Sequence, residues 1–90
     1  MIPGPDPMKI RYFAWLRERT GTSEETPDLP ESVKTTGDLM SWLAARDEGY
    51  AFAFEQSETI RIAVNQEHVE EDHVLSGTEE VAFFPPMTGG

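Results

Sequence analysis

Two kinds of hydrophobic periodicity run along the chain. Apolar residues recur at every second position in residues 9–16 and 59–64, which is typical of half-buried strands. A further strand is predicted at residues 79–84, and short edge strands are predicted within residues 22–29 and around His68, after a tight turn at Asn65-Gln66. The side chains expected to face the core from the two periodic strands are Ile10, Tyr12, Ala14, Leu16, Ile60, Ile62 and Val64.

Helical spacing appears in residues 36–46, where Leu39, Trp42 and Leu43 lie three or four positions apart. Thr35 and Asp38 at its start fit a capping box, so we predict one main helix there. Residues 17–21 are expected to form a turn with a short helical twist, and residues 50–54 an apolar loop beneath the sheet. Because a single helix covers only one face, this order of elements predicts an α+β domain with a mixed sheet of about five strands.

The 90 residues include 17 acidic and 7 basic side chains, for a formal net charge of −10. This balance argues against nucleic-acid binding and an anionic membrane surface, and it favours a partner with a basic docking face. A soluble acidic protein whose charge steers no partner is the alternative. The chain has no cysteine, which excludes disulfides, iron–sulfur clusters and thiol catalysis.

No apolar run approaches the ~20 residues needed to cross a bilayer, and residues 1–7 lack the features of a signal peptide. We therefore expect a cytoplasmic protein with a disordered leader at residues 1–7, one domain at residues 8–84 and a flexible tail at residues 85–90.

That tail ends in Thr88-Gly89-Gly90, directly after a hydrophobic strand and two prolines. Pro85 and Pro86 have fixed φ and no backbone N–H, so they end the strand. The two glycines have no side chains and can enter a channel too narrow for other residues. Fully extended, the six residues after Phe84 reach roughly 20 Å. We interpret this segment as a functional tail that carries one reactive group, the Gly90 carboxylate.

With this ending, the chain resembles the β-grasp, ubiquitin-like sulfur carriers, and within them the small subunits of molybdopterin synthase (the MoaD family). The likeness covers residues 8–90, with modest departures at Thr78-Glu79 and at Gly37. The segments that carry it are residues 13–18 (FAWLRE) with Gly21, residues 63–66 (AVNQ), residues 72–81 (DHVLSGTEEV) and residues 82–90 (AFFPPMTGG).

The resemblance implies a specific chemistry at the tail. An adenylating, MoeB-like activating enzyme uses ATP to adenylate Gly90, and a sulfur donor protein converts the adenylate to a thiocarboxylate. Met87, Thr88 and Gly89 then thread into the large subunit, expected as two copies with two small subunits. There the sulfur passes to a pterin precursor, cyclic pyranopterin monophosphate. The chain itself binds no cofactor and has no self-contained active site.

An aromatic patch is expected on the face of the sheet opposite the helix. Phe13, Trp15 and Phe84 alternate with the predicted core residues, and a β-grasp sheet places its first and last strands side by side. Such patches mark partner surfaces, so we predict that this one docks both the activating enzyme and the large subunit. If the parity of one strand is misassigned, these aromatics belong to the core. Arg17 either pairs with an acidic group on a partner or is solvated.

Other readings remain open beside the carrier. His68 and His73 flank three acidic residues, but their spacing suits no single face of a helix or strand, so solvated turn residues are favoured over a metal site. A carrier for thiamine thiazole synthesis shares the chemistry, although the Phe-Phe-Pro-Pro run points away from it. A ubiquitin-like modifier would instead be conjugated through Gly90 to lysines of other proteins. A plain β-grasp binding module would not use the two glycines.

Overall fold

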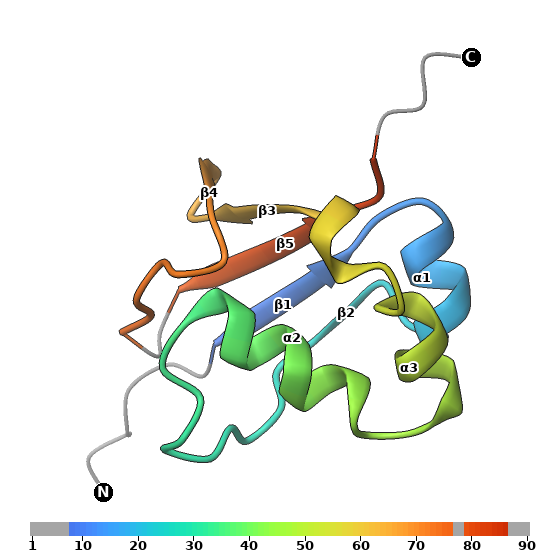
Figure 1. Cartoon of the computed structure of the whole chain (residues 1–90), viewed down its shortest axis with the longest axis horizontal. Helices are drawn as coiled ribbons and strands as arrows, with labels where there is room; N and C mark the ends of the chain where they lie inside the picture. Colours follow the sequence, from blue (N-terminus) through green and yellow to red (C-terminus); the bar gives the residue numbers. More distant parts are fainter. Residues whose placement is uncertain (1–7, 77–78, 87–90) are drawn as a thin grey trace, which may run out of the picture.

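The computed structural model describes residues 8–76 and 79–86. The sheet order is β2-β1-β5-β3-β4, with β5 parallel to β1 and antiparallel to β3 (Figure 1). The predicted α+β class and mixed five-stranded sheet are therefore confirmed. The elements are β1 (Lys9–Tyr12), α1 (Trp15–Thr20), β2 (Glu24–Glu25), α2 (Thr36–Ala44), α3 (Glu48–Ala53), the 3₁₀ helix η1 (Ser57–Thr59), β3 (Arg61–Val64), β4 (Glu67–Val69) and β5 (Glu80–Phe84).

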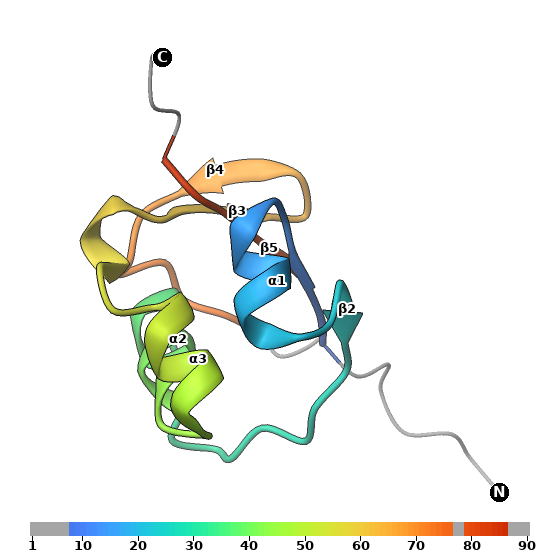
Figure 2. The ribbon, with the colours of Figure 1, turned by 90° about the vertical axis from the view of Figure 1, so that its right-hand side faces the viewer.

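The two central strands, β1 and β5, build the inner face of the sheet. Ile10 lies opposite Val81 and Tyr12 opposite Phe83, and all four side chains are buried. Helices α2 and α3 lie together on one side of the sheet (Figure 2) and add Leu39, Leu43 and Tyr50 to the same core. The period of two in the sequence thus places one face of each central strand against the helices.

The first strand is shorter than predicted. It ends at Tyr12, and Ala14 turns the chain with φ 54° and ψ −133° before α1 begins at Trp15. The amide of Leu16 donates to the carbonyl of Phe13 at 3.1 Å and closes this turn. Ala14 is therefore exposed, while Leu16 reaches the core from a helix. Over so short an apolar run, alternation does not distinguish a strand from a strand followed by a helical turn.

The main helix, α2, begins as predicted. The Asp38 amide donates to Thr35 Oγ1 at 3.1 Å, and the Thr35 amide donates to Asp38 Oδ2 at 3.1 Å, which completes the capping box. The helix ends at Ala44, two positions before the expected end.

The predicted apolar loop at residues 50–54 is wrong, because a second short helix, α3, covers most of it. Asp47 directly follows the predicted helix, and its Oδ1 accepts from the Tyr50 amide at 3.0 Å and caps α3. The single expected helix is thus joined by α1 and α3. No helix within residues 8–76 and 79–86 is long and apolar enough to span a membrane.

A two-residue turn joins β3 to β4, as predicted. Asn65 and Gln66 both adopt positive φ, 51° and 71°, the conformation that a type I′ hairpin requires. The Asn65 amide donates to the Glu80 carbonyl at 2.8 Å, and the Glu80 amide donates to Asn65 Oδ1 at 3.0 Å. The turn is thereby fastened to the beginning of β5.

Candidate functional site

An aromatic pair, Phe13 and Phe84, lies on the helix-free face of the sheet. The two rings are stacked, with centroids 4.5 Å apart and planes 11° from parallel. Phe84 is the last residue of β5, and Phe13 follows β1, held by its amide donating to the Phe83 carbonyl at 3.2 Å. Both side chains are half-buried. Two of the three residues predicted for the patch therefore meet on the predicted face.

Trp15, the third predicted member, lies elsewhere because the turn at Ala14 directs it into α1. The guanidinium carbon of Arg19 lies 4.2 Å from the Trp15 ring centroid and 3.6 Å from that of Phe52 in α3. Arg19 Nη1 also donates to the Phe52 carbonyl at 3.1 Å. Trp15 thus helps to join two helices and is not part of the patch.

The charges beside the aromatic pair are largely neutralised within the chain. Arg11 Nη1 lies 3.2 Å from Glu80 Oε1, and the Arg11 guanidinium carbon lies 5.1 Å from the centroid of the Phe13 ring. Lys9 Nζ lies 3.2 Å from Glu24 Oε2. Exposed pairs of this kind add little stability. Their effect here is a surface of low net charge around two apolar rings.

Two small residues extend this face across β5 and β3, because Ala82 of β5 lies opposite Ala63 of β3. Neither side chain rises far above the sheet, which leaves the Phe13–Phe84 pair prominent. We call the surface formed by Phe13, Phe84, Ala82 and Ala63 the docking face.

The residues predicted to thread into a partner, Met87, Thr88, Gly89 and Gly90, lie outside the described residues. Pro85 and Pro86, which precede them, are described and half-buried, and they follow directly from Phe84 of the docking face. Arg17 is exposed on α1, and no carboxylate within the described part of the chain pairs with it. Its contact with a partner stays a prediction.

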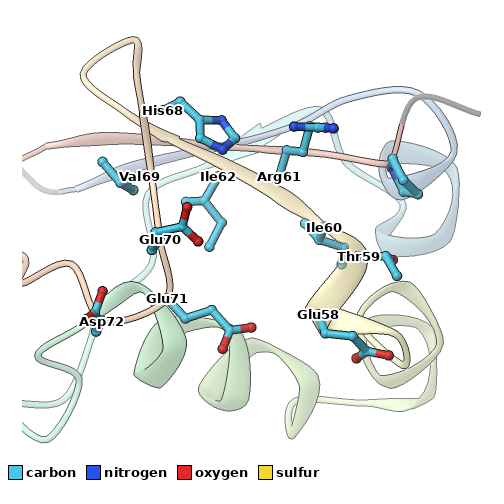
Figure 3. Close-up of a pocket in the computed structure, with 11 residues that line it drawn as sticks. Glu58, Thr59, Ile60, Arg61, Ile62, His68, Val69, Glu70, Glu71 and Asp72 are labelled. Atoms are coloured by element: carbon cyan, nitrogen blue, oxygen red, sulfur yellow. The ribbon is translucent and has the colours of Figure 1, made fainter.

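An open groove of about 820 Å³ borders Pro86, between β3, η1 and the segment after β4 (Figure 3). The side chains of Arg61 and His68 rise on one side of it, whereas the Glu58, Glu71 and Asp72 side chains lie on the side of the helices. No group of three or more histidine or acidic side chains in residues 8–76 and 79–86 is placed to hold a metal ion.

A partly buried polar cluster that sequence reasoning missed lies beneath the sheet. The carboxylate of Glu25 accepts hydrogen bonds from Tyr50 Oη at 2.6 Å, Tyr12 Oη at 2.7 Å and Arg46 Nη1 at 2.7 Å. Burial alone would raise the pKa of Glu25, but these three donors outweigh it and lower the pKa below its usual value. Edge strand β2 is thereby attached to β1 and to α3.

The two tyrosines of this cluster keep their protons. Burial, followed by the hydrogen bond to Glu25, raises the pKa of Tyr50 to about 12, and the same causes raise that of Tyr12 further. Neither group exchanges protons near neutral pH, so the cluster is a structural support. The one sequence signal for it was parity: Glu25 lies opposite Ile10 and shares its inward side.

Comparison with known proteins gives a consistent result. The chain matches the ThiS family over residues 10–90. It is 41% identical over 85 residues to the molybdopterin synthase sulfur carrier subunit of Escherichia coli (strain K12), covering 92% of this chain and 99% of that protein. It is 35% identical over 88 residues to the subunit of the same name from Homo sapiens, covering 92% and 93% of the two chains.

Solved structures with the same fold include a putative molybdopterin converting factor, subunit 1, from Pyrococcus furiosus, with a TM-score of 0.70 and 30% identity over 89% of this chain and 97% of that one. SAMP1 from Haloferax volcanii gives a TM-score of 0.69 and 26% identity over 92% and 98% of the two chains. These likenesses confirm the predicted β-grasp, ubiquitin-like fold.

Proposed function

This chain belongs to the ThiS family, and from that membership we propose that it is the sulfur carrier subunit of a molybdopterin synthase. The observation that carries the proposal is the 41% identity to a sulfur carrier subunit over nearly the whole length of both chains. The geometry supports it, because the docking face ends at Phe84 and the chain continues from there into the predicted tail.

We place the chemistry at Gly90. A carboxylate is a poor electrophile until a good leaving group is attached, and this chain has no means of attaching one. An activating enzyme therefore transfers AMP from ATP to the Gly90 carboxylate and releases pyrophosphate. Sulfur at the sulfide level, supplied by a donor protein, then attacks the Gly90 carbonyl carbon; a C–S bond forms, the C–O bond to AMP breaks, and a thiocarboxylate and free AMP result. With no cysteine in the sequence, the tail is the place for a covalently carried sulfur.

The large subunit receives the loaded tail in this scheme, in an assembly of two small and two large subunits. Met87, Thr88 and Gly89 thread into it, and the Gly90 sulfur passes to the pterin precursor. The docking face holds each partner in turn, because Phe13 and Phe84 offer an apolar contact directly before the tail. Binding there makes the attack of the sulfur effectively intramolecular.

The decisive experiment is the intact mass of the chain after incubation with the activating enzyme, ATP and a sulfur source. We expect a gain equal to sulfur replacing oxygen, localised to Gly90. The matched control carries one extra residue after Gly90, which should block the gain without changing the melting temperature. An unchanged wild-type mass, with the enzyme active on another carrier, would refute the proposal.

A second candidate is a ubiquitin-like protein modifier conjugated through Gly90 to lysines. It is favoured by the likeness to H. volcanii small archaeal modifier protein 1, which has a TM-score of 0.68 and 25% identity over 89% of this chain. Blotting a cell extract for high-mass, lysine-linked adducts separates the two functions, since a dedicated carrier forms none.

A further inference from the structure

The acidic surplus of the chain does not extend to its docking face. Among the described strand residues, five have charged side chains on the helix-free side of the sheet: Lys9, Arg11, Arg61, Glu24 and Glu80. Three are basic and two acidic, so these strand residues add one net positive charge around the docking face, whereas the whole chain carries −10. A partner that covers this side of the sheet therefore meets a slightly positive surface, although the composition of the chain is strongly acidic.

All seven basic residues of the sequence lie in the described part of the chain, and four of them pair with carboxylates within it. The remaining three, Arg17, Lys34 and Arg61, have no such pair in residues 8–76 and 79–86. Arg17 lies on α1 and Lys34 precedes α2. Of the three, Arg61 is the one on the sheet.

Arg61 adjoins the docking face and the start of the tail. It lies directly opposite Phe84 in the pairing of β3 with β5, so the two side chains are cross-strand neighbours on one face. It is exposed, and it lines the same groove as Pro86. Figure 3 shows its guanidinium rising away from the carboxylates of Glu58 and Glu71, which lie on the helix side.

We propose that the large subunit presents an acidic side chain to Arg61 when it covers Phe84, within an otherwise apolar contact. In the free chain water solvates the Arg61 guanidinium, so no desolvation free energy opposes its charge. A partner surface laid over Phe84 removes water from Arg61 as well, and an unpaired desolvated charge would weaken binding. A facing carboxylate satisfies the charge and accepts two hydrogen bonds from the planar guanidinium.

We take the large subunit as the partner that covers Phe84, because the relatives of this chain are named as subunits of the synthase. This inference therefore rests on the proposed function. Charge complementarity sets its chemistry. The net charge of the whole chain predicts a partner with a basic surface. The charges on the helix-free side of the sheet predict the opposite at the docking face, namely an acidic group on the partner.

The test compares Arg61→Glu with Lys34→Glu in the full chain. Both changes shift the net charge by the same amount at exposed positions without a described in-chain pair, but Lys34 lies off the docking face. We expect Arg61→Glu to weaken binding to the large subunit at least tenfold in a calorimetric titration, and Lys34→Glu to change it less than twofold. Arg61→Gln should weaken binding less than Arg61→Glu and should flatten its dependence on salt.

Unchanged affinity of Arg61→Glu, or equal weakening by Lys34→Glu, would overturn the inference. Circular dichroism melting should show all three variants folded, since neither side chain forms an ion pair with the described residues 8–76 and 79–86. Sulfur loading of Gly90 in the wild type separates the two proposals. If loading and binding of the large subunit persist while Arg61→Glu has no effect, the carrier function stands and the acidic contact does not. If the wild type neither loads nor binds, both fail.

Discussion

Two aromatic clusters, one inside the molecule and one on its surface, meet at neighbouring chain positions near the ends of β1 and β5. Tyr12 and Phe83 face inward, with ring centroids 6.2 Å apart, and Phe54 meets Phe83 edge-on at 5.2 Å. Phe13 and Phe84, the next residue in each case, stack at 4.5 Å on the other side. The inner rings are buried and the outer pair is half-buried. Position in the alternation, and not residue type, decides which aromatics stabilise the fold and which are available to a partner.

The largest effect is expected from comparing Phe83→Ala with Phe84→Ala. Removal of the fully buried Phe83 ring should lower the free energy of unfolding by about 3–5 kcal/mol, because it opens a cavity that its neighbours cannot fill. Removal of the half-buried Phe84 ring should cost less, because it loses the stacking with Phe13, worth about 0.5–1.5 kcal/mol, and only part of the apolar burial that Phe83 loses. Urea unfolding measures both values.

The same two variants separate stability from binding. Phe84→Ala should lose the activating enzyme and the large subunit in a pull-down while it remains folded. Full retention of both proteins would remove the docking role from this face. Equal destabilisation by the two variants would show that the outer pair also belongs to the core.

A smaller effect is expected at Glu25, which supports the inner cluster through Tyr12 and Tyr50. Glu25→Gln should lower the free energy of unfolding by about 1–3 kcal/mol at pH 7, because the charged acceptor of three donors is replaced by a neutral amide. The control Glu24→Gln removes only an exposed pair with Lys9 and should cost less than about 1 kcal/mol.

The pH dependence of these variants follows from the lowered pKa of Glu25 in the folded chain. Its contribution is fully present above the pKa of an unfolded glutamate and is lost as the pH falls through the lower folded value. Wild type and Glu25→Gln should therefore converge in stability toward acidic pH. A constant difference between them down to pH 3 would contradict the hydrogen-bonded carboxylate.

The smallest effect, and one of opposite sign, is expected at the turn that separates Phe13 from Trp15. Ala14 holds φ 54° and ψ −133°, a conformation that costs a residue with a Cβ atom about 1–3 kcal/mol. Ala14→Gly should therefore raise the free energy of unfolding by about 1 kcal/mol, after the entropy that glycine adds to the unfolded chain. Ala51→Gly, at an exposed position in α3, should lower it by about 0.5–1 kcal/mol. A loss of stability in both variants would show that the turn is unstrained.

Local patterns in the sequence predicted the elements that local chemistry determines. The capping box at Thr35, the turn at Asn65-Gln66 and the opposite parity of Phe13 and Phe84 to the core were all readable, because each depends on residues close in the chain. The end of β1 was not, since Trp15 and Leu16 continue the alternation after the backbone has turned. Asp47, two positions before Gly49, directly follows the predicted helix, and its side chain accepts from the Tyr50 amide and caps the next helix.

The supporting cluster could not be predicted for a different reason. Glu25 meets Tyr12, Arg46 and Tyr50 from 13, 21 and 25 positions away, and no spacing rule connects residues at those distances in the chain. The same holds for Arg61, because the lack of an ion pair to it within the described residues depends on where the acidic side chains lie in space.

The position of β5 in the sheet has a consequence for synthesis on the ribosome. β5 is the last strand in chain order, yet it lies between β1 and β3, and its Glu80 contacts Arg11 across 69 residues of sequence. Nascent chain that precedes β5 lacks the strand that joins the two halves of the sheet, and contacts so distant in sequence form late in folding. Phe13 gains its stacking neighbour only when Phe84 has been translated. A partner that binds both rings therefore binds only chains whose translation has passed β5. Chains that terminate before Phe84 lack one ring and are not bound.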